Sequence, residues 1–193
     1  MLNNIIGYYA KVTDMALVNL KNEKKFQFGR YLKNNAITAT VKDHYHKIHR
    51  SKQADKLVDD YVKAMNNMYK LAQSEYNTTL TKLKATNDPI AKQKILNDYA
   101  NNGCHGFTAK NGARWNIETY SNMYSTHVNN ELLRLREIEN AKGNLFLIST
   151  HGTECDLCIP WEGRTVTRKQ LDIARGEGLF HPRCMHFVSE VTA

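Results

Sequence analysis

Two short motifs near the C-terminus have the residue types and the spacing of metal-ligand pairs. Cys155 and Cys158 are separated by two residues, and so are His181 and Cys184. Two intervening residues can form a tight turn that directs both donor atoms of a pair to one ion. Three thiolates and one imidazole make a tetrahedral set that suits zinc. The sequence therefore predicts one structural zinc ion held by Cys155, Cys158, His181 and Cys184.

Other interpretations of this stretch stay open at the level of sequence. The thiols could be ordinary buried side chains, and His151 or His186 could replace one of the four predicted ligands. A redox role for the C-x2-C pair is disfavoured because no βαβ pattern surrounds it. A catalytic zinc would keep one coordination position open to water, usually beside an acid or base. Glu154 and Glu162 lie nearby, but nothing in the spacing fixes either as that base.

The overall composition is that of an ordinary globular protein. The chain has 193 residues, of which 41% are hydrophobic and 24% charged, enough for one domain or for a helical part with a small module. No apolar run approaches the ~20 residues of a membrane span, and the first residues lack the pattern of a signal peptide. We therefore expect no membrane partner and synthesis in a host cytoplasm, where reduced thiols favour metal binding over disulfides.

The net charge of +8 is concentrated in one basic segment, residues 20–56. This segment contains ten lysines and arginines against three carboxylates, which gives it a local net charge of +7. Basic residues interleaved with aromatic ones are typical of a surface that binds a polyanion. The alternative is a solvated helical face with surplus lysine. The candidate nucleic-acid contacts are Lys21, Lys24, Lys25, Arg30, Lys33, Lys42, Lys47, Arg50 and Lys52.

Helical periodicity dominates the region 1–100. Apolar residues at steps of three and four predict a helix over 3–50, broken near Gly29 or Asn34-Asn35, and a clearer helix over 52–85. A shorter helix is expected to follow and to end at about residue 99. The residues expected to cap or begin helices are Ser51, Pro89 and, further along the chain, Asn116.

The region 101–193 mixes strands with helices. Asn111-Gly112 predicts a β-hairpin, and the helix capped by Asn116 is expected to end at Gly143. Short apolar or β-branched runs then predict strands over 145–148, 164–167 and 185–191, with a helical turn over 168–174. We therefore predict an α+β fold with long N-terminal helices, a β-hairpin, a helix and a small zinc-stapled, β-rich C-terminal module.

Parts of this second region resemble a known family. One segment begins at Gly106 and reads G-F-T-A-K-N-G-A-R-W-N-I-E-T-Y-S-N-M-Y-S-T-H; another begins at Leu147 and reads L-I-S-T-H-G-T-E-C-D-L-C-I-P-W-E-G-R. Both are similar to the phage minor capsid protein 2 family. The ending L-F-H-P-R-C-M-H, from Leu179, resembles the H-P-x-C-x-H close of the Mu F-like minor head proteins. The resemblance covers roughly residues 103–187.

The resemblance implies a minor head component of a tailed phage. Such a protein is expected inside the capsid near the portal, where it aids head assembly or the packaging and ejection of DNA. The implied partners are portal or major capsid proteins and phage DNA, and the implied location is the virion. The basic segment suits a location beside DNA.

We expect the protein to have no enzymatic turnover, since the four predicted ligands would fill a tetrahedral zinc and leave no place for water. The alternative is a metal-dependent nuclease or another nucleic-acid hydrolase that uses the His/Cys cluster. A deaminase is disfavoured because Pro160 follows the second cysteine instead of preceding the C-x2-C pair. A sequence-specific zinc finger is disfavoured because the second ligand pair does not close a recognition helix.

Overall fold

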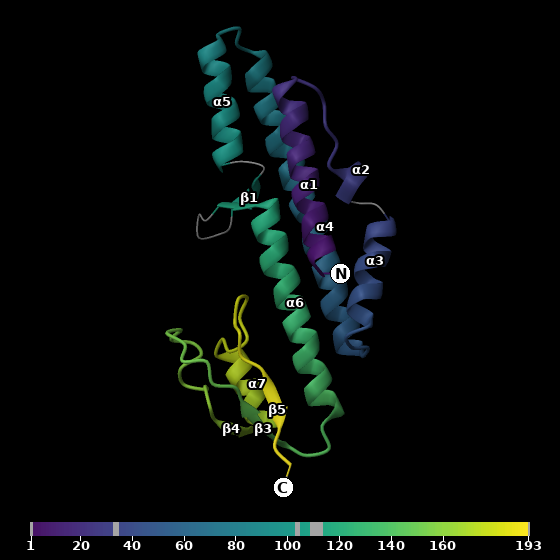
Figure 1. The fold of residues 1–193 in the computed structure, drawn as a ribbon, viewed down its shortest axis with the longest axis vertical. Helices are drawn as coiled ribbons and strands as arrows, with labels where there is room; N and C mark the ends of the chain where they lie inside the picture. The colour runs from purple at the N-terminus through teal and green to yellow at the C-terminus, as the bar shows by residue number, and fades with distance from the viewer. Residues whose placement is uncertain (1, 33–34, 103–104, 109–113, 193) are drawn as a thin grey trace. The chain divides into compact units, whose positions relative to one another are not determined.

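The computed structural model describes residues 2–32, 35–102, 105–108 and 114–192. The chain divides into two compact units: unit 1 consists of Met1–Lys42 and Asp59–Asn122, and unit 2 consists of Asp43–Val58 and Met123–Ala193. Each unit combines helices with a small antiparallel sheet (Figure 1). The predicted mixture of helices and strands is therefore confirmed. The predicted domain boundary at residue 100 stays a prediction.

The first half of the chain is helical, as expected. The predicted helix over 3–50 is divided into three, because the chain leaves helical geometry after Lys21 and α2 is separate from α3. The predicted helix over 52–85 is confirmed almost to the residue. The helices are α1 (Leu2–Lys21), α2 (Gly29–Leu32), α3 (Asn35–His46), α4 (Lys52–Lys84) and α5 (Pro89–Asn102). No helix within the described ranges is long and apolar enough to cross a lipid bilayer.

Side-chain caps begin the helices where the sequence predicts them. The Ser51 hydroxyl accepts a hydrogen bond from the Ala54 N–H at 3.1 Å at the start of α4. Pro89 is the first residue of α5, where its missing N–H costs no hydrogen bond. The Asn116 side-chain oxygen accepts from the Thr119 N–H at 2.6 Å and caps α6 (Ile117–Asn140). These local bonds satisfy backbone donors that the helices cannot pair internally.

An extended segment, residues 24–28, separates α1 from α2 and is held by side chains of α4. The Gln73 amide donates to the Phe26 carbonyl and accepts from the Phe28 N–H, both at 2.9 Å. The Tyr76 hydroxyl donates to the Lys24 carbonyl at 2.6 Å. Both phenylalanine rings of the segment are buried and meet edge to face, with centroids 5.0 Å apart. Burial of these rings and the paired backbone explain why the helix stops here without a proline.

The predicted β-hairpin is present in unit 1. Strands β1 (His105–Thr108) and β2 (Arg114–Asn116) pair antiparallel, with Phe107 opposite Trp115. The predicted turn residues Asn111 and Gly112 lie outside the described residues, so the turn type stays a prediction.

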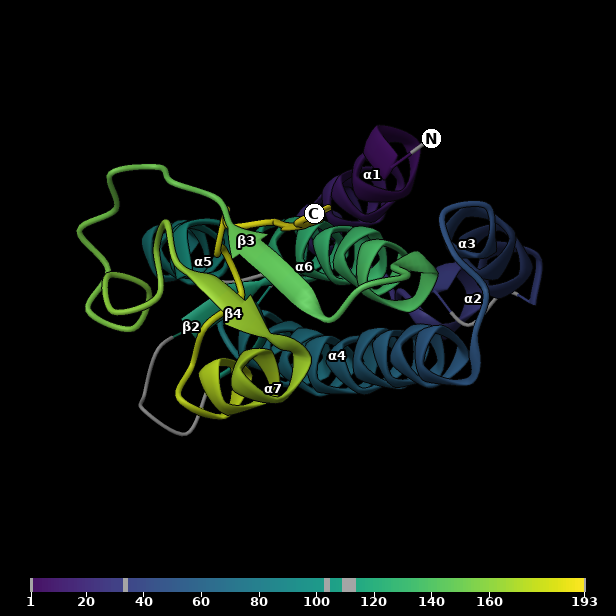
Figure 2. The same cartoon turned by 90° about the horizontal axis from the view of Figure 1, so that it is seen from below.

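Unit 2 is built around a three-stranded antiparallel sheet in the order β4-β3-β5. Its elements are β3 (Leu145–Ile148), β4 (Thr165–Thr167), α7 (Arg168–Gly176) and β5 (Val188–Glu190). One face of the sheet is buried, and α7 lies beside it (Figures 1 and 2). The core formed by this face and the neighbouring helices contains Ile138, Phe146, Ile148, Cys158, Val166, Leu171, Ala174, Leu179, Phe180, Cys184 and Val188.

The last strand is shorter than predicted. Pairing with β3 begins at Val188, whereas the sequence predicted a strand over 185–191. The carbonyl of His186 instead accepts a hydrogen bond from the guanidinium of Arg134 at 2.8 Å. The predicted strand is therefore too long at its start, because His186 bonds to Arg134 of α6 and to Cys184. The Phe187 carbonyl still accepts from the Ser149 N–H at 3.0 Å, next to the paired residues.

Candidate metal centre

The C-x2-C pair lies in a tight turn of unit 2, as its spacing predicts. The N–H groups of Cys158 and Ile159 donate to the Cys155 carbonyl at 2.9 and 3.0 Å. The Thr153 hydroxyl accepts from the Cys155 N–H at 3.1 Å and fixes the entry to the turn. These backbone bonds form the tight turn that carries both sulfur atoms.

The H-x2-C pair forms a second turn, which brings its side chains to the first pair. The Cys184 N–H donates to the His181 carbonyl at 2.8 Å. Phe180 and Arg183 have positive φ angles of 66° and 75°, a conformation that side-chain-bearing residues rarely adopt. Such backbone strain persists only where the surroundings impose it, and here it closes the turn that carries His181 and Cys184.

Three of the six separations among the predicted donor atoms suit a tetrahedral ion. His181 Nε2 lies 3.3 Å from Cys155 Sγ and 3.4 Å from Cys158 Sγ, and the sulfurs of Cys158 and Cys184 are 3.7 Å apart. With Zn–S of about 2.3 Å and Zn–N of about 2.0–2.1 Å, donor atoms of a tetrahedral site lie about 3.5–3.8 Å apart. The donor types, three sulfurs and one imidazole nitrogen, suit zinc. The four predicted donor atoms do not form one group within 4.8 Å of one another, because Cys184 groups with Cys158 and His186 and not with Cys155 and His181.

The tautomer of His181 also suits metal binding. Its Nδ1 lies 2.7 Å from the Pro182 carbonyl oxygen, which can only accept a hydrogen bond. Nδ1 therefore carries the proton, and the lone pair of Nε2 points to the two sulfurs. A backbone carbonyl that holds the distal N–H is the usual outer partner of a metal-bound histidine.

His186 is brought to the same cluster and keeps the alternative ligand set open. Its side chain is buried, with Nδ1 3.3 Å from Cys184 Sγ and Nε2 3.2 Å from a Glu162 carboxylate oxygen. The donor atoms of Cys158, Cys184 and His186 lie within 4.8 Å of one another, and so do those of Cys155, Cys158 and His181. Cys158 is common to both groups. The geometry thus places His186 as either a ligand or a partner of the Cys184 sulfur.

His151, the other alternative ligand, lies outside both groups. Its Nε2 is 2.8 Å from the Ser149 hydroxyl, and its ring meets the His186 ring edge to face, with centroids 5.1 Å apart. Neither group of donor atoms within 4.8 Å of one another in the described chain includes His151. It therefore borders the cluster next to His186 and is not brought to the sulfurs.

The two cysteines of the first pair differ in their electrostatic surroundings. Burial raises the pKa of the Cys158 thiol to about 12, and the neighbouring Cys155 and Cys184 reinforce the shift. The Leu157 backbone N–H lowers the pKa of the Cys155 thiol, with further contributions from Cys158 and His181. Without a metal, Cys158 therefore carries its proton at neutral pH. A bound divalent cation would displace that proton, because only the thiolate is a strong ligand.

Glu162 lies between the loop that leads to the C-x2-C pair and two histidines, His151 and His186. Its carboxylate accepts hydrogen bonds from the backbone N–H groups of His151 and Thr153 and lies beside His186 Nε2. The His151 N–H, followed by the His186 side chain, holds the pKa of this carboxyl below its ordinary value. Sequence reasoning named Glu162 only as a weak candidate base; in the structure it accepts hydrogen bonds that fold the loop.

Replacing Glu162 by glutamine is expected to destabilise unit 2 and to change its acid sensitivity. A carboxyl whose folded pKa is depressed contributes stability that is present above its unfolded value, near 4.5, and lost as the pH falls through the folded value. We therefore expect Glu162→Gln to lower the urea midpoint of unfolding at pH 7. We also expect the urea midpoints of this variant at pH 7 and pH 3 to differ by less than those of the unmodified protein. The control is Glu154→Gln on the exposed side of the same loop. Equal midpoints for Glu162→Gln and the unmodified protein would contradict this role.

Sequence reasoning missed Arg134, the largest fully buried side chain near the cluster. Its guanidinium donates to the carbonyls of His186 at 2.8 Å and Cys184 at 3.0 Å, and it pairs with Glu131 at 2.5 Å. Its Cζ also lies 4.4 Å from the centroid of the Phe180 ring. The helix pattern around it offered one signal, since Arg134 stands between the apolar Leu132 and Leu135.

The predicted nucleic-acid residues are divided between the two units. Lys21, Lys24, Lys25 and Arg30 are exposed on unit 1, whereas Lys47, Arg50 and Lys52 are exposed on unit 2. Lys33 lies outside the described residues. Two of the predicted cations form ion pairs: Lys42 with Asp59 at 2.7 Å and Lys47 with Asp43 at 2.6 Å. DNA binding by this segment stays a prediction.

Comparison with known proteins identifies the family that the sequence motifs indicate. The family described as phage minor capsid protein 2 matches residues 8–192, which is nearly the whole chain. The match extends well beyond the segments from 103 to 187 and takes in the N-terminal helices. Comparisons with curated proteins and with solved structures give no match.

Proposed function

Because the chain belongs to the phage minor capsid protein 2 family, we propose that it is a structural component inside a tailed-phage head, near the portal. In this role it aids head assembly or the packaging and ejection of DNA. Its partners are portal or major capsid proteins and phage DNA. It acts by binding and has no turnover of its own.

The proposed cofactor is one structural zinc ion, and the spacing of the sulfur and nitrogen donors is the observation that carries this proposal. The proposed ligands are Cys155, Cys158, His181 and Cys184. Three separations among their donor atoms, from 3.3 to 3.7 Å, lie close to the edges of a tetrahedral site. Cys158 and Cys184 also belong to the hydrophobic core of unit 2. A metal that joins these two turns would therefore stabilise the core directly.

The proposed set of four protein ligands would fill a tetrahedral metal, which favours a structural role. Catalytic zinc sites keep a position for water, whereas closed Cys3His sites do not. The carboxylate nearest the cluster, Glu162, is engaged by two backbone N–H groups and lies beside His186. The test is incubation with duplex DNA, single-stranded DNA and RNA in magnesium, manganese or zinc. Cleavage that disappears in His151→Ala, with fold and zinc content unchanged, would overturn this proposal in favour of a nuclease.

Binding of DNA by the basic segment is expected to be independent of sequence and strongly dependent on salt. Each phosphate that a lysine or arginine neutralises releases counterions, so the affinity for random duplex should fall steeply as salt rises. Replacing Lys24, Lys25, Lys33 and Lys47 by glutamine should weaken binding and flatten the salt dependence. The control removes four exposed lysines elsewhere: Lys11, Lys70, Lys94 and Lys169. An affinity that is absent at low salt, or unchanged by salt, would refute the DNA-binding part of the proposal.

A further inference from the structure

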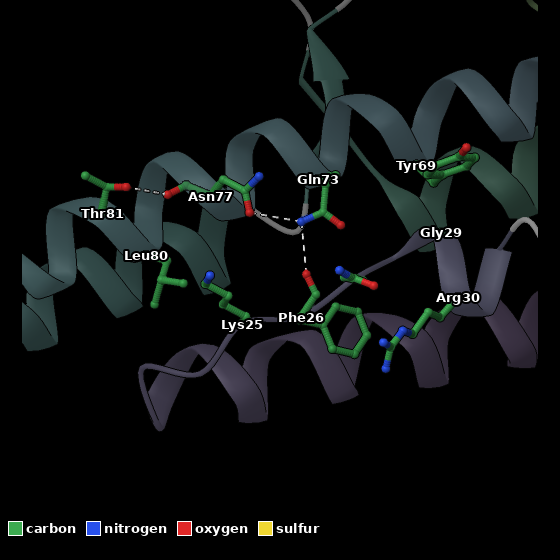
Figure 3. A pocket seen from close by; sticks show the side chains of 10 residues that line it. Lys25, Phe26, Gly29, Arg30, Tyr69, Gln73, Asn77, Leu80 and Thr81 are labelled. Carbon is green, nitrogen blue, oxygen red and sulfur yellow. Dashed lines mark hydrogen bonds between the residues drawn. The ribbon is translucent and has the colours of Figure 1, made fainter.

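A hollow of about 740 Å³ opens in unit 1 between the extended segment 24–28, the start of α2 and one face of α4. Its size falls within the range of ligand-binding pockets, about 300–1,000 Å³. Figure 3 shows Lys25 near Leu80, and Arg30 nearer to Gly29. The lining residues are Lys25, Phe26, Gln27, Gly29, Arg30, Tyr69, Gln73, Asn77, Leu80 and Thr81.

The walls of this hollow are held in place by bonds within unit 1. Tyr69, Gln73 and Asn77 are spaced by four residues and project from one face of α4. The Gln73 amide holds the opposite wall through the Phe26 carbonyl and the Phe28 N–H, and it donates to the Asn77 side chain at 3.0 Å. The hollow is therefore formed before any ligand arrives.

The charge of the lining favours an anion. It contains two cations, Lys25 and Arg30, and no carboxylate. Both cations are exposed, and within the described part of the chain neither has an acidic partner, unlike Lys42 and Lys47. The side-chain amides of Gln27 and Asn77 add neutral donors. The Gln73 amide is already bonded to the Phe26 carbonyl, the Phe28 N–H and the Asn77 side chain, and the Thr81 hydroxyl donates to the Asn77 carbonyl at 2.9 Å.

We infer that this hollow binds a short stretch of single-stranded nucleic acid. Lys25 and Arg30 would meet phosphates, while the Gln27 amide and the Asn77 side-chain N–H groups would meet base edges without selecting a sequence. Cations that track the backbone of one strand are typical of single-strand binding grooves. A recess between a helix and an extended segment admits one strand, whereas a duplex presents two strands on a convex surface. An acidic peptide would also meet the cations, so its competition is one outcome of the test.

The inference deepens the proposed binding of phage DNA and depends on it. The test measures the affinity of a fluorescent oligothymidylate for the full chain by anisotropy over a range of salt. Lys25→Gln/Arg30→Gln is compared with Lys11→Gln/Lys94→Gln, which removes the same charge from exposed sites of unit 1 outside the hollow. A photo-crosslinking amino acid at position 81 is compared with one at position 94. Competition with a duplex of equal length and with polyglutamate identifies the preferred occupant.

We expect Lys25→Gln/Arg30→Gln to bind the oligothymidylate several-fold more weakly. The slope of log affinity against log salt concentration should become shallower by about 0.7 for each phosphate contact removed. The control pair should keep most of the affinity, and crosslinks should form at position 81. Equal effects of the two double variants, or crosslinks at position 94 alone, would overturn this inference while leaving DNA binding by the chain intact. More effective competition by duplex or polyglutamate would overturn it as well. No binding of any oligonucleotide would instead refute the proposed DNA partner.

Discussion

Replacing Cys158 by serine is expected to abolish zinc binding and to unfold the Cys/His part of unit 2. Cys158 is the thiol common to both groups of donor atoms, so its loss removes the ion under either ligand set. Structural zinc contributes folding free energy outright, with apparent values of about 10–16 kcal/mol in isolated zinc fingers. Unit 2 has its own core, so we expect a smaller loss, about 5 kcal/mol, or about 10–20 °C in melting temperature.

The matched control is Cys104→Ser, which removes a thiol outside both ligand pairs. Chelation of the unmodified protein should reproduce the effect of Cys158→Ser, and restored zinc should reverse it. Acidification should release the metal as well, because protons compete for the thiolates. A melting temperature that is the same for Cys158→Ser, Cys104→Ser and the chelated protein would contradict a structural metal.

Single variants of the histidines decide between the two ligand sets. If His181 is the ligand and His186 the partner of Cys184, His181→Ala should lose zinc and His186→Ala should retain it with lower affinity. Removal of an outer partner typically weakens metal binding about 10–100-fold. If His181→Ala retains zinc fully and His186→Ala loses it, the imidazole ligand is His186 and not His181.

Truncating Arg134 is expected to be the most destabilising single change outside the cluster. Arg134→Met would leave the Cys184 and His186 carbonyls without their donor and would leave the buried Glu131 with Arg175 as its ion-pair partner. Removing one member of a buried ion pair costs about 3–5 kcal/mol. The measurement is urea unfolding, with Arg136→Met on the exposed side of α6 as control.

Two further variants separate the charge of Arg134 from its geometry. Arg134→Lys keeps the charge but cannot donate to two carbonyls and a carboxylate at once, so an intermediate loss is expected. Glu131→Gln combined with Arg134→Met should recover part of the stability, because the buried carboxylate is then gone. Equal stability of Arg134→Met and Arg136→Met would show that the buried guanidinium does not organise the ligand loop.

The sequence predicted the helices and the ligand pairs because each depends on local signals. Helix starts depend on such signals: Ser51 and Asn116 each accept a hydrogen bond from an N–H three residues further on. Pro89 begins its helix through the fixed geometry of its own ring. Likewise, two intervening residues are enough to make each ligand pair a tight turn. Such short-range chemistry can be read from one chain alone.

What the sequence did not predict depends on contacts between distant residues. The extended segment 24–28 is fixed by Gln73, more than forty positions away. Arg134 acts on carbonyls at positions 184 and 186, and nothing in its helix pattern identifies those partners. The last strand was predicted too long for the same reason, because α6 takes over a carbonyl that the pattern assigned to the sheet.

X-ray absorption at the zinc edge, on protein purified without chelators, tests the central claim most directly. One zinc per chain with three sulfur neighbours at about 2.3 Å and one nitrogen neighbour at about 2.0–2.1 Å is the predicted result. This shell would establish a closed structural site in this minor capsid protein. A chain without zinc, or a zinc ion with a water oxygen in its first shell, would contradict it.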